Sequence, residues 1–235
     1  MKIGYLHFLL FLVSFLSAYG NDIVVTWGDS DSGGDSSVVV LDSSGVGVSS
    51  HVSTIYSGNH AFAAVKNDGS VVTWGVSSLG GDSSGVDFSG GVSTIYSNGS
   101  AFVALKNDGS VVTWGDRIRG GDSSGVDFSS GVRSIYSNSG AFAALKNDGS
   151  VVTWGLSSFG GDSSGVDFSG GVRTIYSNAF AFAALKNDGS VVTWGDPNRG
   201  GDLSGVDFSS GVRSTYSTSG AFAAIMYDGS VVTWG

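Results

Sequence analysis

The chain has 235 residues, a net charge of −9 and no cysteine. An acidic chain without a basic stripe is a poor candidate for binding nucleic acid or anionic membranes, and the lack of cysteine excludes disulfides, thiol catalysis and cysteine-based zinc sites. Glutamate and glutamine are absent while glycine, serine, valine and aspartate abound, and 41% of residues are hydrophobic, so the composition predicts a folded all-β protein.

The first twenty residues have the pattern of a secretory signal peptide. A lysine precedes an apolar stretch over 9–16, and small residues at Ala18 and Gly20 predict cleavage after Gly20. A membrane anchor is the weaker alternative, because a spanning helix needs roughly 20 apolar residues. We therefore expect a signal peptide over 1–20, one domain over 21–235, and a secreted or cell-surface protein.

The rest of the chain is a tandem repeat. The letters VVTWG begin at Val24, return at Val71 after 47 residues, and then return every 40 residues until Val231. Five complete units therefore follow one isolated strand at 22–28. The loops after VVTWG alternate between two types, which indicates that an 80-residue double unit was duplicated.

Each unit predicts a small antiparallel sheet. In the fourth unit, β-rich runs at 171–177 and 181–186 are followed by an Asn-Asp-Gly turn and by VVTWG at 191–195, which is the pattern of a β-hairpin. The letters GVDF predict a short fourth strand. Because these runs do not alternate apolar with polar residues, both faces should be covered. A β-propeller or a solenoid achieves this by stacking the units.

The letters AL..DG.V..WG, repeated over 22–235, resemble the repeat of the regulator-of-chromosome-condensation superfamily, and are most similar to its short-repeat secreted branch, which includes a β-lactamase inhibitor protein. The resemblance implies a β-propeller, commonly of seven blades. Five units and an isolated first strand fall short of that number, so we expect a coding sequence truncated before the ring closes. The alternatives are a small propeller, or one with edge strands that need to be covered. The signal peptide argues against the nuclear nucleotide-exchange role of the family's namesake.

The repeated aromatic and charged residues are expected to be structural. We expect the six tryptophans to pack between blades and the repeated aspartates to cap turns and loops rather than to bind a metal ion. The lysines beside the Asn-Asp-Gly turns, and the arginines near Asp127, Asp167 and Asp207, are expected to form surface ion pairs with aspartates. Those arginines are Arg133, Arg173 and Arg213.

The loops that differ between near-identical units are the best functional candidates, because binding residues concentrate on loops held by a rigid scaffold. The loops at 76–79, 116–119, 156–159 and 196–199 should lie on one face. The predicted partner-binding residues are Leu79, Arg117, Arg119, Phe159 and Arg199. Drift in unconstrained loops is the alternative. A second variable loop contains Asn98, which begins the one Asn-Gly-Ser sequon and is a candidate glycosylation site.

Little in the sequence could carry catalysis. The domain has two histidines, His51 and His60, and no serine in a nucleophile-elbow context, so we predict no catalytic residue, cofactor or metal. The predicted function is a secreted or cell-surface, non-catalytic module that binds an extracellular protein through one propeller face. The alternatives are a structural or adhesive repeat protein, a carbohydrate-binding propeller and, least favoured, an aspartate-based hydrolase. No nucleic-acid partner and no membrane span are expected.

Overall fold

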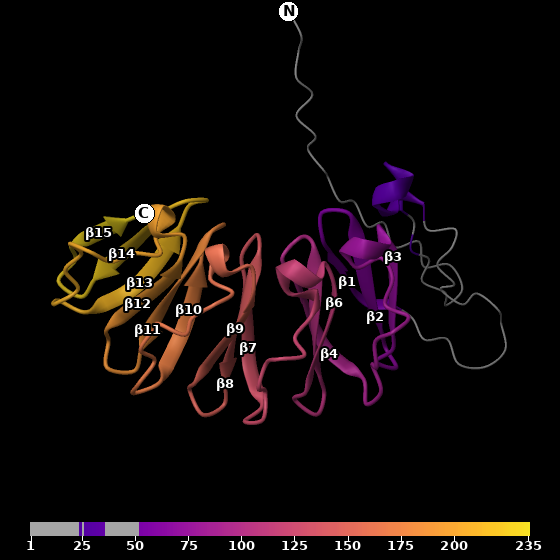
Figure 1. Ribbon diagram of the computed structural model, residues 1–235, viewed down its shortest axis with the longest axis horizontal. Helices are drawn as coiled ribbons and strands as arrows, with labels where there is room; N and C mark the ends of the chain where they lie inside the picture. Colours follow the sequence, from indigo (N-terminus) through magenta and orange to yellow (C-terminus); the bar gives the residue numbers. More distant parts are fainter. Residues whose placement is uncertain (1–23, 25, 36–51) are drawn as a thin grey trace, which may run out of the picture.

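The computed structural model describes residue 24, residues 26–35 and residues 52–235. The predicted signal peptide and its cleavage position lie outside the described residues and stay predictions. The described part contains five three-stranded antiparallel sheets, one per repeat, which stand side by side in a curved row (Figure 1). We call these sheets blades 1 to 5 in chain order. None of the helices in the described residues is long and apolar enough to cross a membrane.

The strands follow the predicted hairpins closely. In each blade the first strand pairs with the second and the second with the third. The bounds are β1 (Val52–Ser57), β2 (Ala61–Lys66) and β3 (Val71–Gly75) in blade 1; β4 (Val92–Ser97), β5 (Ala101–Lys106) and β6 (Val111–Gly115) in blade 2; β7 (Val132–Ser137), β8 (Ala141–Lys146) and β9 (Val151–Gly155) in blade 3; β10 (Val172–Ser177), β11 (Ala181–Lys186) and β12 (Val191–Gly195) in blade 4; and β13 (Val212–Ser217), β14 (Phe222–Met226) and β15 (Val231–Trp234) in blade 5.

The middle strand of each blade explains why the sequence does not alternate in polarity. In β8, residues 141–145 are all fully buried. Alternate side chains face opposite neighbours: Ala143 and Leu145 pack against blade 4, whereas Phe142 and Ala144 pack against blade 2. Both faces of the strand are therefore covered by protein, which requires a continuous apolar run.

The Asp-Gly turn closes each hairpin as predicted. In blade 3, the amide of Ser150 donates to Asp148 Oδ1 at 2.9 Å, and the Ser150 hydroxyl donates to the same oxygen at 2.6 Å. Gly149 has a φ of +85°, a conformation that costs glycine little and other residues much. The same aspartate–serine turn occurs in the other four blades, for example at Asp108. These aspartates cap turns, as the sequence analysis expected.

Five of the six tryptophans are packing residues. Trp74, Trp114, Trp154, Trp194 and Trp234 are 3–6% exposed, and each stacks on a phenylalanine of the neighbouring strand at 5.2–5.4 Å between ring centroids. In blades 1 to 4 the indole nitrogen also donates to a glycine carbonyl in the loop before the blade, as Trp154 does to Gly120 at 3.0 Å. Trp27 differs, being 62% exposed.

The predicted fourth strand at GVDF is wrong. Residues 126–128 pair with no strand, and the Val126 amide donates instead to Ser123 O within a turn. The segment is held by its phenylalanine, because Phe128 packs edge-on against Trp154 at 5.4 Å and 84°. A single aromatic anchor thus replaces a ladder of backbone hydrogen bonds.

Candidate binding face

The predicted variable loops all follow the third strand of a blade and lie at one end of the row, at the top of Figure 1. We call this end the upper face; the Asp-Gly turns lie at the opposite, lower end. The loops contain the short helical turns η2 (Ser77–Leu79), η3 (Arg117–Gly121), η4 (Ser157–Phe159) and η5 (Pro197–Arg199). Each loop bends into the protein at a buried glycine with positive φ, such as Gly120 at +102°. The glycine fixes the loop while leaving its preceding residues at the surface.

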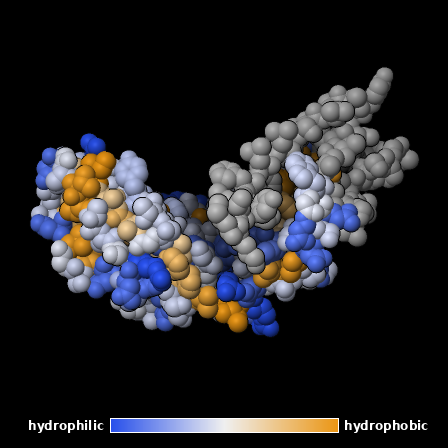
Figure 2. Space-filling model, turned by 90° about the horizontal axis from the view of Figure 1, so that it is seen from above, coloured by the Kyte–Doolittle hydropathy of each residue, from blue (hydrophilic) through white to orange (hydrophobic). Residues whose placement is uncertain are grey.

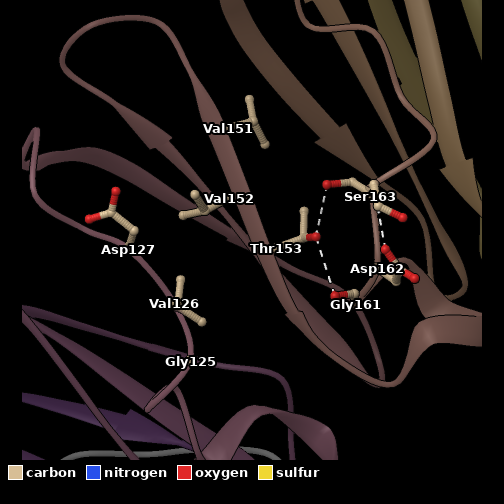
Figure 3. A pocket seen from close by; sticks show the side chains of 10 residues that line it. Gly125, Val126, Asp127, Val151, Val152, Thr153, Gly161, Asp162 and Ser163 are labelled. Atoms are coloured by element: carbon tan, nitrogen blue, oxygen red, sulfur yellow. Dashed lines mark hydrogen bonds between the residues drawn. The ribbon is translucent and has the colours of Figure 1, made fainter.

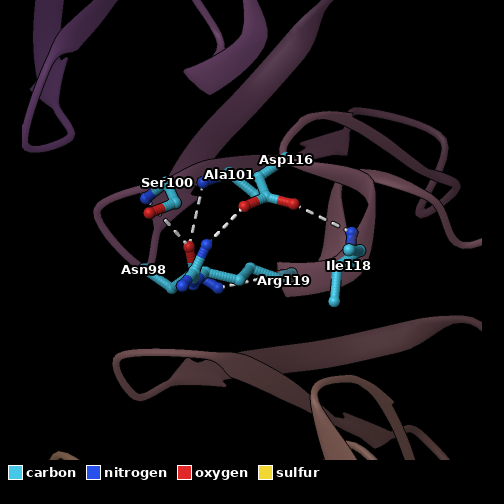
Figure 4. Close-up of polar contacts among 6 residues, drawn as sticks. All are labelled: Asn98, Ser100, Ala101, Asp116, Ile118 and Arg119. Carbon is cyan, nitrogen blue, oxygen red and sulfur yellow. Dashed lines mark hydrogen bonds and ion pairs between the residues drawn. The ribbon is translucent and has the colours of Figure 1, made fainter.

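Two of the four loops are built on an aspartate–arginine pair. Asp116 Oδ1 accepts from the Ile118 amide at 3.0 Å, and Asp116 Oδ2 binds Arg119 Nη1 at 2.6 Å (Figure 4). Asp196 and Arg199 repeat this arrangement, again at 2.6 Å. The first and fourth residues of the loop are therefore neighbours in space.

The other two loops use apolar residues at the same two positions. Val76 and Leu156 begin their turns without a side-chain cap. Leu156 and Phe159 both lie against Gly140, close enough that a Cβ atom there would be about 3 Å from each of them. The alternation in the sequence therefore changes two positions of the loop together. Loops that begin with aspartate have arginine as their fourth residue, and loops that begin with an apolar residue have an apolar fourth residue.

Arg117 and Ile118 are both strongly exposed on the upper face. The Arg117 side chain is 81% exposed and its Nη2 lies 2.7 Å from Asp122 Oδ2, while Ile118 is 68% exposed. The Ser124 amide, followed by Arg117, lowers the pKa of Asp122 to about 2. Both arginines of this loop therefore carry a carboxylate partner, and an apolar side chain protrudes between them.

A second row of loops, between the first and second strands, is tied to the first row. Asn98 Nδ2 donates to Arg119 O at 2.6 Å, and Asn98 Oδ1 accepts from the amides of Ser100 and Ala101 (Figure 4). Asn138 holds Phe159 O in the same way, and Asn178 holds Arg199 O. Each asparagine fastens two variable loops into one surface.

The asparagine geometry bears on the candidate glycosylation site. A glycan on Asn98 would be attached to the same nitrogen that donates to Arg119 O. The equivalent Asn138 and Asn178 make this hydrogen bond outside any sequon. Glycosylation of Asn98 stays a prediction, and it would replace one of the two hydrogens on the nitrogen that makes this hydrogen bond.

Two of the predicted binding residues meet through a residue that the sequence analysis did not select. Phe159 lies 5.4 Å from Phe180 between ring centroids, and the Arg199 guanidinium sits 4.2 Å from the centroid of the Phe180 ring. We call Phe159, Phe180 and Arg199 the aromatic–arginine patch. Phe180 had a signal in the sequence: Asn-Ala-Phe is the one loop of the second row that carries an aromatic residue.

The remaining predicted residues do not join this patch. Arg119 lies in the loop before Phe159, and Leu79, which is half-buried, lies two loops before it in the row. From above, the molecule shows hydrophobic atoms in separate clusters among polar ones (Figure 2). The upper face therefore offers separate contact points at its four variable loops.

A surface cavity of about 320 Å³ lies beside the third strand of blade 3 (Figure 3). It is lined by β9 and by residues 125–127 and 161–164. Thr153 Oγ1 lies 3.3 Å from Gly161 O and 3.0 Å from Ser163 Oγ, and Thr73 in blade 1 makes the equivalent contacts. Since the polar groups are engaged with one another and the arrangement recurs between blades, the cavity belongs to the scaffold. In the described ranges, histidine and aspartate side chains form no cluster able to hold a metal ion.

The sequence of the chain matches no protein-family model and no curated protein. Its structure is similar to the ectodomain of receptor kinase CR4 from Physcomitrella patens, with a TM-score of 0.53 and 16% identity over 82% of this chain and 52% of that one. The CRINKLY WD40 ectodomain of the Arabidopsis thaliana receptor kinase ACR4 gives a TM-score of 0.52 and 16% identity over 82% and 66% of the two chains.

A third similar structure is Prp20p, the yeast RCC1 of Saccharomyces cerevisiae, with a TM-score of 0.51 and 15% identity over 77% of this chain and 56% of that one. The chain thus spans between about half and two thirds of the length of these proteins. At sequence identities of 15–16%, the similarity of these structures to this chain shows the fold alone. The chain has the repeat fold of RCC1-like β-propellers, as the resemblance in the sequence implied.

Proposed function

We propose that this chain is a secreted or cell-surface, non-catalytic module that binds another protein through the variable loops of its upper face. The observation that carries the proposal is the contrast within each repeat: the strands are nearly identical, while the upper loops differ in charge and shape and are held by dedicated hydrogen bonds. Aromatic residues and arginine are the side chains most often responsible for tight protein contacts.

The aromatic–arginine patch is the centre of the proposed contact. Phe180 is half-buried and contacts both Phe159 and Arg199, so the patch is ordered before a partner arrives. A preordered patch loses less side-chain entropy on binding than separate mobile residues do. Arg117, Arg119 and Leu79 would then extend the contact along the neighbouring loops.

The similar ectodomains of receptor kinases support the proposal, because a propeller in that position faces the outside of a cell. Prp20p supports it as well, since that protein is described through its binding to Gsp1p and histones. None of these partners is carried over to this chain. The proposal rests on the loops of this protein, whose composition differs from one blade to the next.

The test is an affinity capture from extracellular material with the full chain as bait. The variant replaces Phe159, Phe180 and Arg199 by alanine; the control replaces Tyr227, an aromatic residue that is 66% exposed in the turn at the lower end of blade 5, by alanine. We expect a specific protein to be captured by the wild type and by the control, and to be lost with the triple variant. Equal capture by all three would contradict the proposal, and retention on a glycan array that the triple variant leaves unchanged would favour the carbohydrate-binding alternative.

A further inference from the structure

The first strand of every blade contains a β-bulge at its second residue. In β7, Val132 pairs with Lys146 and Ser134 pairs with Leu145, so Arg133 has no partner on β8. The register shifts at the same place in the other four blades. A bulge releases its extra residue from the pleat and redirects the side chain. Arg133 is accordingly exposed, although Val132 and Ile135 on the same strand are buried.

Three consecutive blades place arginine on this bulge. The bulge residue is Ser53 in blade 1, Ser93 in blade 2, and Arg133, Arg173 and Arg213 in blades 3, 4 and 5. All five are exposed. Because each bulge lies at the start of its strand, next to the Asp-Gly turn, the arginines are at the lower end of the blades, away from the variable loops.

The blades converge at their first strands, which brings the bulge residues into one row. The first strands of consecutive blades approach within 8 Å, from β4 to β7, from β7 to β10 and from β10 to β13. Side chains cross between them: Ser137 Oγ donates to Ser97 O at 2.9 Å, and Tyr136 OH lies 3.4 Å from Thr174 Oγ1. Arg133 Nη2 itself donates to Arg173 O at 2.9 Å. One arginine therefore reaches the backbone of the next.

The expected ion pairs of these arginines are not formed. Among the residues that the structure describes, Arg117, Arg119 and Arg199 each pair with an aspartate, whereas Arg133, Arg173 and Arg213 pair with none. Asp127, the predicted partner of Arg133, lies instead 3.9 Å from the buried Lys146. The physical reason is the bulge, which turns the arginine away from its own blade. Within the described ranges, three like charges thus stand in a row without a salt-bridge partner, in a protein whose net charge is −9.

We propose that Arg133, Arg173 and Arg213 form a binding row for a small anionic ligand that carries several phosphate or carboxylate groups. A guanidinium presents five N–H donors in a planar fork that matches the oxygens of a phosphate or a carboxylate group. Arg133 uses one of these donors in its hydrogen bond to Arg173 O. One guanidinium per blade favours a ligand with anionic groups in series over one with a single charge. The row lies at the opposite end from the aromatic–arginine patch, so it is independent of the proposed protein contact.

The experiment is a calorimetric titration of the full chain with tripolyphosphate, with citrate and with inorganic phosphate in separate arms. The variant R133Q/R173Q/R213Q removes the row. The matched control R117Q/R119Q/R199Q removes the same number of positive charges from the upper face. All six residues are exposed, and an unchanged circular dichroism spectrum will confirm the fold of each protein.

We expect tripolyphosphate or citrate to bind more tightly than inorganic phosphate, and the preferred one of the two identifies the anionic group. The row variant should weaken that binding about tenfold or more, and the control should stay within about twofold of the wild type. The substitution S93R, which adds a fourth arginine in blade 2, should tighten it. Absence of binding in every arm, an equal loss in both triple variants, or no loss in the row variant would overturn the proposal.

Discussion

The interior of a blade and the upper loop that follows it are a few residues apart in the chain, yet their residues vary between blades in different ways. Around Trp154 the same phenylalanine, tryptophan and glycine recur in blade after blade, because atoms of two blades meet there. In the loop at 116–119 the residues change from blade to blade, but in pairs, because the side chains of Asp116 and Arg119 form an ion pair with each other. In these upper loops a substitution at the first position is thus matched by a substitution at the fourth position of the same loop.

The largest effect is expected inside the blade. Phe142 is fully buried and stacks on Trp154 at 5.4 Å, so Phe142→Ala should lower the free energy of unfolding by about 3–5 kcal/mol. Urea unfolding followed by tryptophan fluorescence measures it. As the control on the upper face, Ile118→Ala should change stability by less than about 0.5 kcal/mol, since Ile118 is 68% exposed. Similar losses in the two variants would break the distinction between interior and loop.

The junction between loop and blade comes next. Gly120 has a φ of +102°, and a Cβ atom there would lie 2.6 Å from Phe142 Cδ2. Gly120→Ala should therefore cost about 1–3 kcal/mol through strain and overpacking. Gly125→Ala is the control, because nothing lies within 4 Å of a Cβ atom at that position. Thermal unfolding of both variants tests the difference, and an unchanged Tm for Gly120→Ala would show that the loop is not seated on the ring of Phe142.

The asparagine that joins the two loop rows should have a smaller effect. Asn138 is 7% exposed and donates to Phe159 O at 2.6 Å while accepting two amides. Asn138→Asp keeps the accepting oxygen and loses the donor, and should cost about 1–2 kcal/mol. Asn147→Asp is the matched control, because Asn147 makes an exposed hydrogen bond to Ser130 O at 3.3 Å. If the two variants unfold at the same urea concentration, the loops are not fastened through Asn138.

The smallest expected effects concern the exposed aspartates of the lower end. Hydrogen bonds from Ser210 and Ser230 lower the pKa of Asp228 from 3.8 to about 2. Because the pKa in the folded state is the lower one, this carboxylate stabilises the fold above pH 4, and the contribution is lost as the pH falls through the folded value near 2. Acid titration followed by circular dichroism should show less loss of stability between pH 4 and pH 2 in Asp228→Asn than in the wild type. An identical acid dependence would contradict this assignment.

Much of the scaffold could be predicted from the sequence because its signals are local. The Asp-Gly turns, the continuous apolar strands and the 40-residue spacing each depend on neighbours in the chain, and all three predictions are confirmed. The segment at GVDF was predicted to be a strand because Val126 and Phe128 favour that structure. The segment instead forms a turn, and Phe128 packs against Trp154, a contact that depends on tertiary packing.

The sites were harder to predict because their contacts cross between repeats. Phe180 carried one sequence signal, as the aromatic residue of its loop row, but its contacts with Phe159 and Arg199 form only when three separate loops fold together. The arginines beside Asp127, Asp167 and Asp207 in sequence looked like ion-pair partners. A one-residue β-bulge directs these arginine side chains away from the aspartates, and the spacing of residues in the sequence does not reveal the bulge.

The hydrogen bonds from four of the buried tryptophans to glycine carbonyls share one direction along the chain. Trp114, Trp154 and Trp194 each donate to a carbonyl 34 residues earlier, and Trp74 to one 41 residues earlier. During synthesis on the ribosome, the acceptor therefore always leaves the exit tunnel before its donor. In blades 1 to 4 the tryptophan can complete this bond with residues that have already emerged, so these blades can form in order from the N-terminal one, one repeat at a time.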